Sequence, residues 1–124
     1  MGHLNRGLRA VYDMYIADFE VLNGGFWQLW ENSSGAIAQD LPGAAELLGS
    51  PEFADIFRDA QALWPNGRIP RDRAKRQRLL QQLPEAPVAA LDARYEATQY
   101  HRRTALAVVL GGYVQRHPEE FIVG

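Results

Sequence analysis

Apolar residues recur every three or four positions along the first part of the chain, over residues 4–22. The apolar members of this stretch are Leu4, Leu8, Val11, Tyr12, Tyr15, Ile16, Phe19 and Leu22. Positions three and four apart share one face of an α-helix, so the spacing predicts an amphipathic helix with these residues against the core. Arg9, Asp13 and Glu20 are then expected on the solvent side of that helix.

Glycine and proline divide the rest of the chain into further helical segments. Asn23-Gly24-Gly25 is expected to end the first helix, because glycine tolerates the left-handed backbone of a helix terminus. Further helices are expected over residues 26–30, 40–48, 51–64, 70–83, 88–97 and 100–116. No window alternates with the period of two that is typical of a half-buried strand. The pattern predicts an all-α fold, a compact single-domain bundle of about six or seven short helices over residues 1–124.

Residues that commonly carry catalysis or bind metals are few. The chain has no cysteine, which excludes disulfides, thiolate zinc sites and cysteine nucleophiles. His3, His101 and His117 lie far apart without a local carboxylate at metal-ligand spacing, so we expect no metal site. Neither pair of adjacent glycines fits a phosphate-binding loop, which needs a following lysine and a strand before it. We therefore expect a protein that is not an enzyme and that needs no cofactor.

The hydrophobic segments are too short for a membrane protein. The longest apolar run covers residues 105–110, whereas a membrane-spanning helix needs about 20 residues. Residues 1–9 hold no apolar run of the length found in signal peptides. We expect a cytoplasmic protein with no membrane association.

Charge is distributed unevenly along the chain, although the net charge is only −2. Residues 1–66 carry nine acids and three bases, a balance of −6, whereas residues 67–83 carry six bases and one acid, a balance of +5. An acidic first half suits contact with a basic partner surface.

Three acids form the most regular pattern in that half. Glu52, Asp55 and Asp59 stand at i, i+3 and i+7, opposite the apolar face of a helix that Ser50 and Pro51 are expected to start. Together with a second acidic line on the first helix, they predict a partner-binding surface: Asp13, Glu20, Glu52, Asp55 and Asp59. The expected partner is another protein. We expect the chain itself to be a monomer or a homodimer.

A series of short segments resembles one known family. The segments are Glu20 to Gln28 (EVLNGGFWQ), Trp30-Glu31-Asn32, Ala45 to Gly49, Leu91 to Tyr95 and Tyr113 to Phe121. They are similar, in order and spacing, to the bacterial DNA-mimic-protein-nineteen-like helical domain family. The resemblance implies an all-helical fold without known catalytic activity. We expect its most distinctive element to be structural, tying the end of the first helix to its neighbours: Asn23, Gly24, Gly25, Phe26, Gln28 and Asn32.

Three functional classes follow from these observations. The first is a non-enzymatic protein-interaction domain, an inhibitor or immunity-type protein that binds another protein through a charged surface. The alternative is a DNA mimic that sequesters a DNA-binding protein or transcription regulator through its acidic N-terminal half, although a net charge of −2 is small for a mimic. The third is an enzyme or ligand binder, which would need a deep polar cleft beside Asn23, Gln28 and Asn32.

We expect no direct binding to nucleic acid through the basic segment. Arg71, Lys75 and Arg78 can share one helix face, but Asp72 can pair with Arg76, and the acidic remainder repels a polyanion. In a gel-shift assay the chain should leave duplex DNA unshifted at micromolar concentration and physiological salt. A shift that disappears when the three bases are replaced would contradict this.

Overall fold

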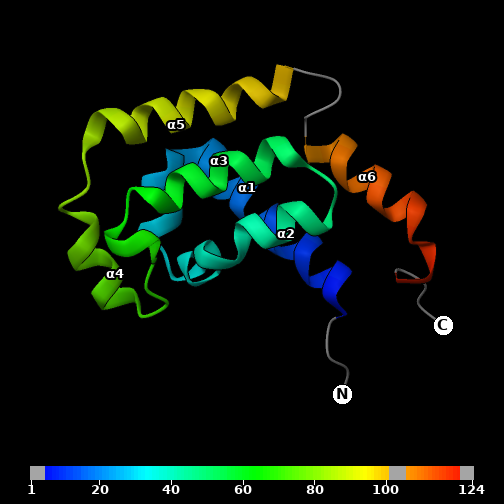
Figure 1. The fold of residues 1–124 in the computed structure, drawn as a ribbon, viewed down its shortest axis with the longest axis horizontal. Helices are drawn as coiled ribbons and strands as arrows, with labels where there is room; N and C mark the ends of the chain where they lie inside the picture. Colours follow the sequence, from blue (N-terminus) through cyan, green and yellow to red (C-terminus); the bar gives the residue numbers. More distant parts are fainter. Residues whose placement is uncertain (1–4, 101–105, 121–124) are drawn as a thin grey trace.

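The computed structural model of the chain describes residues 5–100 and 106–120 (Figure 1). Six α-helices run through these residues: α1 (Arg6–Glu31), α2 (Leu41–Leu47), α3 (Pro51–Ala62), α4 (Arg73–Leu80), α5 (Glu85–Ala97) and α6 (Leu106–Arg116). Short 3-10 helices connect them at Ser33–Asp40, Pro65–Gly67, Thr98–Tyr100 and Pro118–Glu120. The described ranges contain no strand, and the prediction of an all-α fold is confirmed.

Helix starts follow the sequence signals at some places and depart from them at others. Ser50 caps α3 as expected, because its hydroxyl accepts a hydrogen bond from the Phe53 amide at 3.3 Å. Asp72 caps α4 by accepting from the Lys75 amide at 2.9 Å, where pairing with Arg76 had been expected. Asp40 precedes α2 but makes no cap with its side chain.

The core is built around α1, which contacts α2, α4, α5 and α6. Aromatic rings fill its centre, and Trp30 and Trp64 lie edge to face with centroids 5.3 Å apart. Trp27, in contrast, is only partly buried against the core. Phe26 packs edge to face against Phe57 of α3 and Tyr95 of α5. Such edge-to-face pairs add to the stability gained by burial alone.

The inward face of α1 is the opposite of the one that hydrophobic spacing predicts. Its buried positions include small residues and both acids expected in solvent: Gly7, Ala10, Asp13, Met14, Ala17, Glu20 and Val21. Four large apolar residues expected in the core are exposed: Tyr12, Tyr15, Phe19 and Leu22. The small side chains let neighbouring helices approach α1 closely, which bulky aromatic residues would prevent.

A buried arginine holds the end of α1. Arg76 has no exposed surface, and its guanidinium donates to the carbonyls of Trp30 at 2.5 Å and Asn32 at 2.6 Å. It also donates to the carbonyls of Pro70 and Arg71 at 3.1 and 2.9 Å. The last carbonyls of a helix lack partners within the helix, so the guanidinium replaces water there. Burial lowers the pKa of Arg76 below its ordinary value.

Replacing Arg76 should destabilise the fold strongly. Arg76→Met keeps much of the side-chain volume but leaves buried carbonyls without donors, so we expect a loss of about 3 kcal/mol in the free energy of unfolding. Urea denaturation measures this, with the exposed Arg78→Met on the same helix as control. A loss below about 1 kcal/mol for Arg76→Met would contradict the role assigned to the guanidinium.

Candidate functional site

The acids of α3, here called the acidic stripe (Glu52, Asp55 and Asp59), are all exposed, as expected. Two of them face arginines. Asp55 pairs with Arg58 at 3.0 Å, and Asp59 pairs with Arg94 of α5. Glu52 makes no ion pair with any described residue. The stripe is therefore interleaved with positive charge, which reduces the field it presents to a distant partner.

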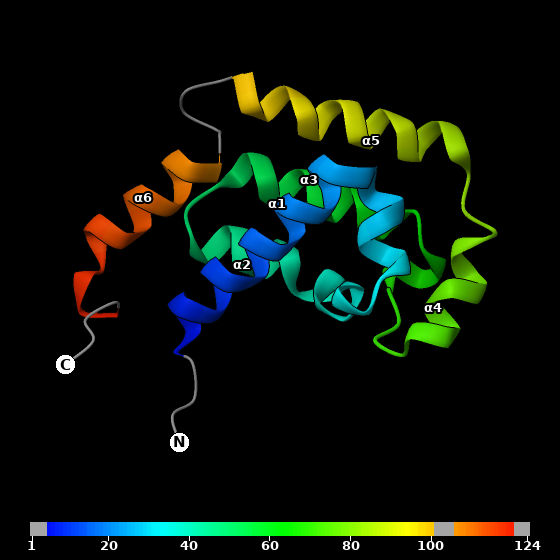
Figure 2. The ribbon, with the colours of Figure 1, turned by 180° about the vertical axis from the view of Figure 1, so that it is seen from behind.

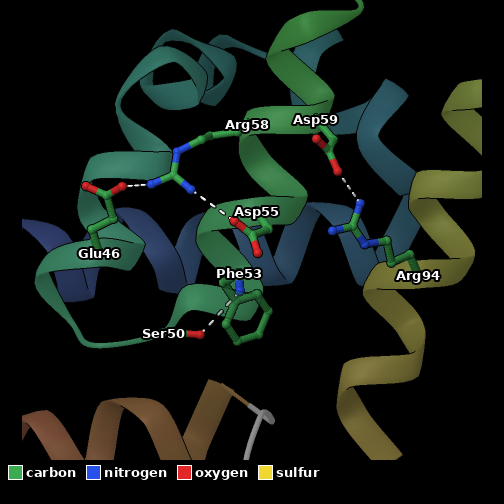
Figure 3. Close-up of polar contacts among 7 residues, drawn as sticks. All are labelled: Glu46, Ser50, Phe53, Asp55, Arg58, Asp59 and Arg94. Carbon is green, nitrogen blue, oxygen red and sulfur yellow. Dashed lines mark hydrogen bonds and ion pairs between the residues drawn. The ribbon is translucent and has the colours of Figure 1, made fainter.

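Arg58 reaches a fourth acid as well, since its guanidinium also pairs with Glu46 of α2 (Figure 3). All these side chains are about half exposed, so the pairs contribute little to stability. The pairs nevertheless place bases among the acids of this surface, so its negative charge is interrupted.

Asp13 and Glu20, the other two acids predicted to bind a partner, are buried, with 6% and 9% of their surface exposed. The placement of these two on an accessible surface was wrong. Glu20 accepts a hydrogen bond from the side-chain Nδ2 of Asn32 at 2.6 Å, which offsets the loss of water around its charge. Asp13 borders a cavity of about 530 Å³ together with Arg9, and burial raises its pKa more than the charge of Arg9 lowers it.

The Asn-Gly-Gly-Phe element forms a kink inside α1. Gly24 has non-helical backbone angles, and Gly25 has φ +74° and ψ −178°, a conformation that only glycine adopts easily. Helical structure restarts at Phe26, whose amide donates to Asp92 of α5 at 2.8 Å. The side-chain Nδ2 of Asn23 donates to the side-chain Oε1 of Gln28 at 3.2 Å, across the kink.

Asp92 is a residue that helix and charge patterns along the chain did not single out. It caps the restarted helix from 66 positions away, so no local rule could have found it. The one available signal is its place in the Leu91 to Tyr95 segment that resembles the family. Burial raises the pKa of Asp92, and the hydrogen bond from the Phe26 amide opposes that rise.

The exposed apolar residues of α1 form a second candidate surface, here called the exposed row (Tyr12, Tyr15, Phe19 and Leu22). Their exposed fractions are 59%, 65%, 62% and 46%. Their spacing of three, four and three positions aligns them along one side of the helix. In Figure 2 α1 lies on the side of the molecule turned toward the viewer, with α5 above it and α6 beside it. Contiguous exposed apolar residues commonly mark interaction sites.

The basic segment presents no uniform cationic face. Arg71 is held by Asp40 through two hydrogen bonds of 2.6 and 2.8 Å, which lower the pKa of that carboxyl. Lys75 and Arg78 are exposed, whereas Arg76 is buried. The expectation that this segment does not bind nucleic acid stays a prediction.

One group in the described ranges has ligand atoms close enough to hold a cation. His117, Glu119 and Glu120 offer ligand atoms within 4.8 Å of one another, so the statement that no carboxylate lies near His117 at ligand spacing was wrong. Tyr113 stacks on His117 at 4.4 Å and donates to Glu120 at 2.5 Å, which raises the pKa of Tyr113 to about 12. Exposed groups of this kind are common without an ion, and we assign none. His3 and His101 lie outside the described residues.

The structure thus defines a small all-α domain with a kinked central helix and an exposed apolar row. A family model described as DMP19-like protein matches residues 2–117, and the chain belongs to that family, as the resemblance had indicated. No curated protein and no solved structure matches the chain. Within the described ranges, no helix has both the length and the hydropathy needed to cross a membrane.

Substitution at the kink should test its backbone geometry. A Cβ atom on residue 25 would lie 2.7 Å from a carboxylate oxygen of Asp92. The substituted residue would also have to keep the positive φ of Gly25. We expect Gly25→Ala to reduce the free energy of unfolding by about 2 kcal/mol. Gly43→Ala is the matched control, because a Cβ there meets nothing within 4 Å and helix α2 should gain up to about 1 kcal/mol. Equal thermal stability of the two variants would contradict the assigned strain.

Proposed function

We propose that this chain is a non-enzymatic protein-interaction domain of the inhibitor or immunity kind, and that it contacts its partner protein through the exposed row. The observation that carries the proposal is the alignment of Tyr12, Tyr15, Phe19 and Leu22 in solvent on one helix. Large aromatic side chains at such positions supply much of the binding energy at protein interfaces.

The size of the row suits such a role. Fully covered aromatic side chains bury roughly 150–250 Å², so exposure near 60% leaves on the order of 100 Å² per ring available to a partner. With Leu22 added, the row is comparable to the largest apolar patch of an ordinary monomer, about 300–600 Å². It also sits on a helix held by four others, so little conformational entropy is lost when it binds.

The acidic stripe fits a supporting role. Its acids are exposed, but Arg58 and Arg94 lie among them, which argues against DNA mimicry as the main activity. An acidic surface of this kind favours the approach of a basic partner and its rate of association more than the final affinity. Glu52, Asp55 and Asp59 therefore remain predicted contributors, without Asp13 and Glu20.

The proposal predicts which variant loses a captured partner. A double variant, Tyr15→Ser with Phe19→Ser, removes two exposed rings and should weaken binding by at least about 30-fold, corresponding to roughly 2 kcal/mol. The melting temperature should stay within a few degrees of the original, because exposed side chains contribute little to folding. Affinity capture from native cells followed by titration of the purified partner measures the binding, and thermal denaturation of each variant measures the melting temperature.

Two further variants make this test selective. Tyr100→Ser with Val108→Ser removes exposed apolar surface elsewhere, and binding should persist. A triple variant, Glu52→Gln, Asp55→Asn and Asp59→Asn, should slow association, with an effect that shrinks at high salt. Loss of the partner in the triple variant but not in the row variant would overturn the proposal. It would indicate binding through the acidic stripe, which is the surface that a DNA mimic would use.

A further inference from the structure

Two cavities adjoin the exposed row and meet at one residue. The first, of about 360 Å³, is lined by Tyr15, Asp18, Phe19, Leu22 and Asn23. The second, of about 300 Å³, lies at the kink between α1 and α5, and its lining includes Leu22, Asp92 and Glu96. Leu22 lines both, so an apolar surface runs directly into a polar one.

Among the residues that the structure describes, the lining of these two cavities carries negative charge: it includes three acids (Asp18, Asp92 and Glu96) and no base. The stripe on α3 differs, because arginines pair with its acids. Asp18 uses one oxygen to accept from the Tyr95 hydroxyl at 2.8 Å, and Asp92 uses one to accept from the Phe26 amide. No donor from a described residue reaches the second oxygen of either carboxylate, and Glu96 is exposed.

The spacing of the row adds a shape requirement. Its members are three, four and three residues apart and extend over about 15 Å of helix axis. Two packed helices contact each other through residues with this same alternating spacing. A helix lying along α1 could place one apolar side chain beside each member of the row. In helix-in-groove recognition, an amphipathic helix lays its apolar face along such a surface with anchors three and four residues apart.

Resting on the proposed function, we infer that the partner contributes an amphipathic basic helix. Its apolar face covers Tyr12, Tyr15, Phe19 and Leu22, and its lysines or arginines reach Asp18, Asp92 and Glu96. Complementary charge is what selects this occupant over an acidic or purely apolar helix. Burial raises the pKa values of Asp18 and Asp92, and a cation brought beside them would lower both.

Synthetic peptides test this inference without the natural partner. The probe is a labelled helical peptide of about 18 residues, with leucine on one face and lysine on the other. One comparison peptide replaces every lysine by glutamate, and another scrambles the leucine–lysine sequence. Fluorescence anisotropy with the full chain should show micromolar binding of the leucine–lysine helix and at least about tenfold weaker binding of both comparison peptides.

Variants locate the contact. Asp18→Asn with Glu96→Gln removes two charges at the cavities, keeps an acceptor for Tyr95, and should weaken the leucine–lysine peptide about three- to tenfold at low salt. Glu31→Gln with Glu85→Gln changes the net charge equally at exposed sites outside the row, the stripe and the two cavities, and should leave the affinity unchanged. Equal effects of the two double variants would show non-specific attraction and overturn the inference.

The outcomes also separate this inference from the proposed function. If the lysine and glutamate helices bind equally well and Tyr15→Ser with Phe19→Ser abolishes both, the row is an interaction site without the inferred charge preference. If Tyr15→Ser with Phe19→Ser leaves binding of the leucine–lysine peptide intact, the exposed row is not the site that binds it, and the inference is overturned. Absence of any peptide binding overturns the inference, while the captured partner still decides the proposed function.

Discussion

The short helical segment that follows the kink, residues 26–31, is held at both ends by side chains from other helices. A carboxylate from α5 accepts the first amide at Phe26, and the Arg76 guanidinium from α4 covers carbonyls near the other end, at Trp30 and Asn32. An anion at the start of a helix and a cation at its end both oppose the helix dipole favourably. A segment too short to be stable alone is thereby fixed in position.

The rest of the core depends on that position. Phe26 and Trp30 lie on the fixed segment, and their rings contact aromatic residues of α3 and α5 and Trp64. Because the kink changes the direction of the chain, the segment can bury its rings while the longer part of α1 turns its own rings outward. The kink therefore separates a segment that buries its rings from a longer one whose row is exposed.

Sequence patterns were sufficient for the fold class, the helix stop at Asn23-Gly24-Gly25 and the start of α3, since each depends on local backbone chemistry. They failed for the orientation of α1. Hydrophobic spacing identifies which residues share a face, but it does not say whether that face meets the core or a partner. Contacts between distant segments explain why Asp13 and Glu20 can be buried, and no pattern in a single sequence contains such contacts. The same holds for the roles of Asp92 and Arg76.

The bond between Phe26 and Asp92 has a consequence for the order in which the molecule is made. Its two ends are separated by 66 positions, and a ribosome adding roughly 5–20 residues per second needs about 3–13 s to pass from one to the other. During that interval the kink has no cap, and the ring of Phe26 can meet Phe57 but not yet Tyr95. The final packing of the segment after the kink therefore waits until most of the chain has emerged.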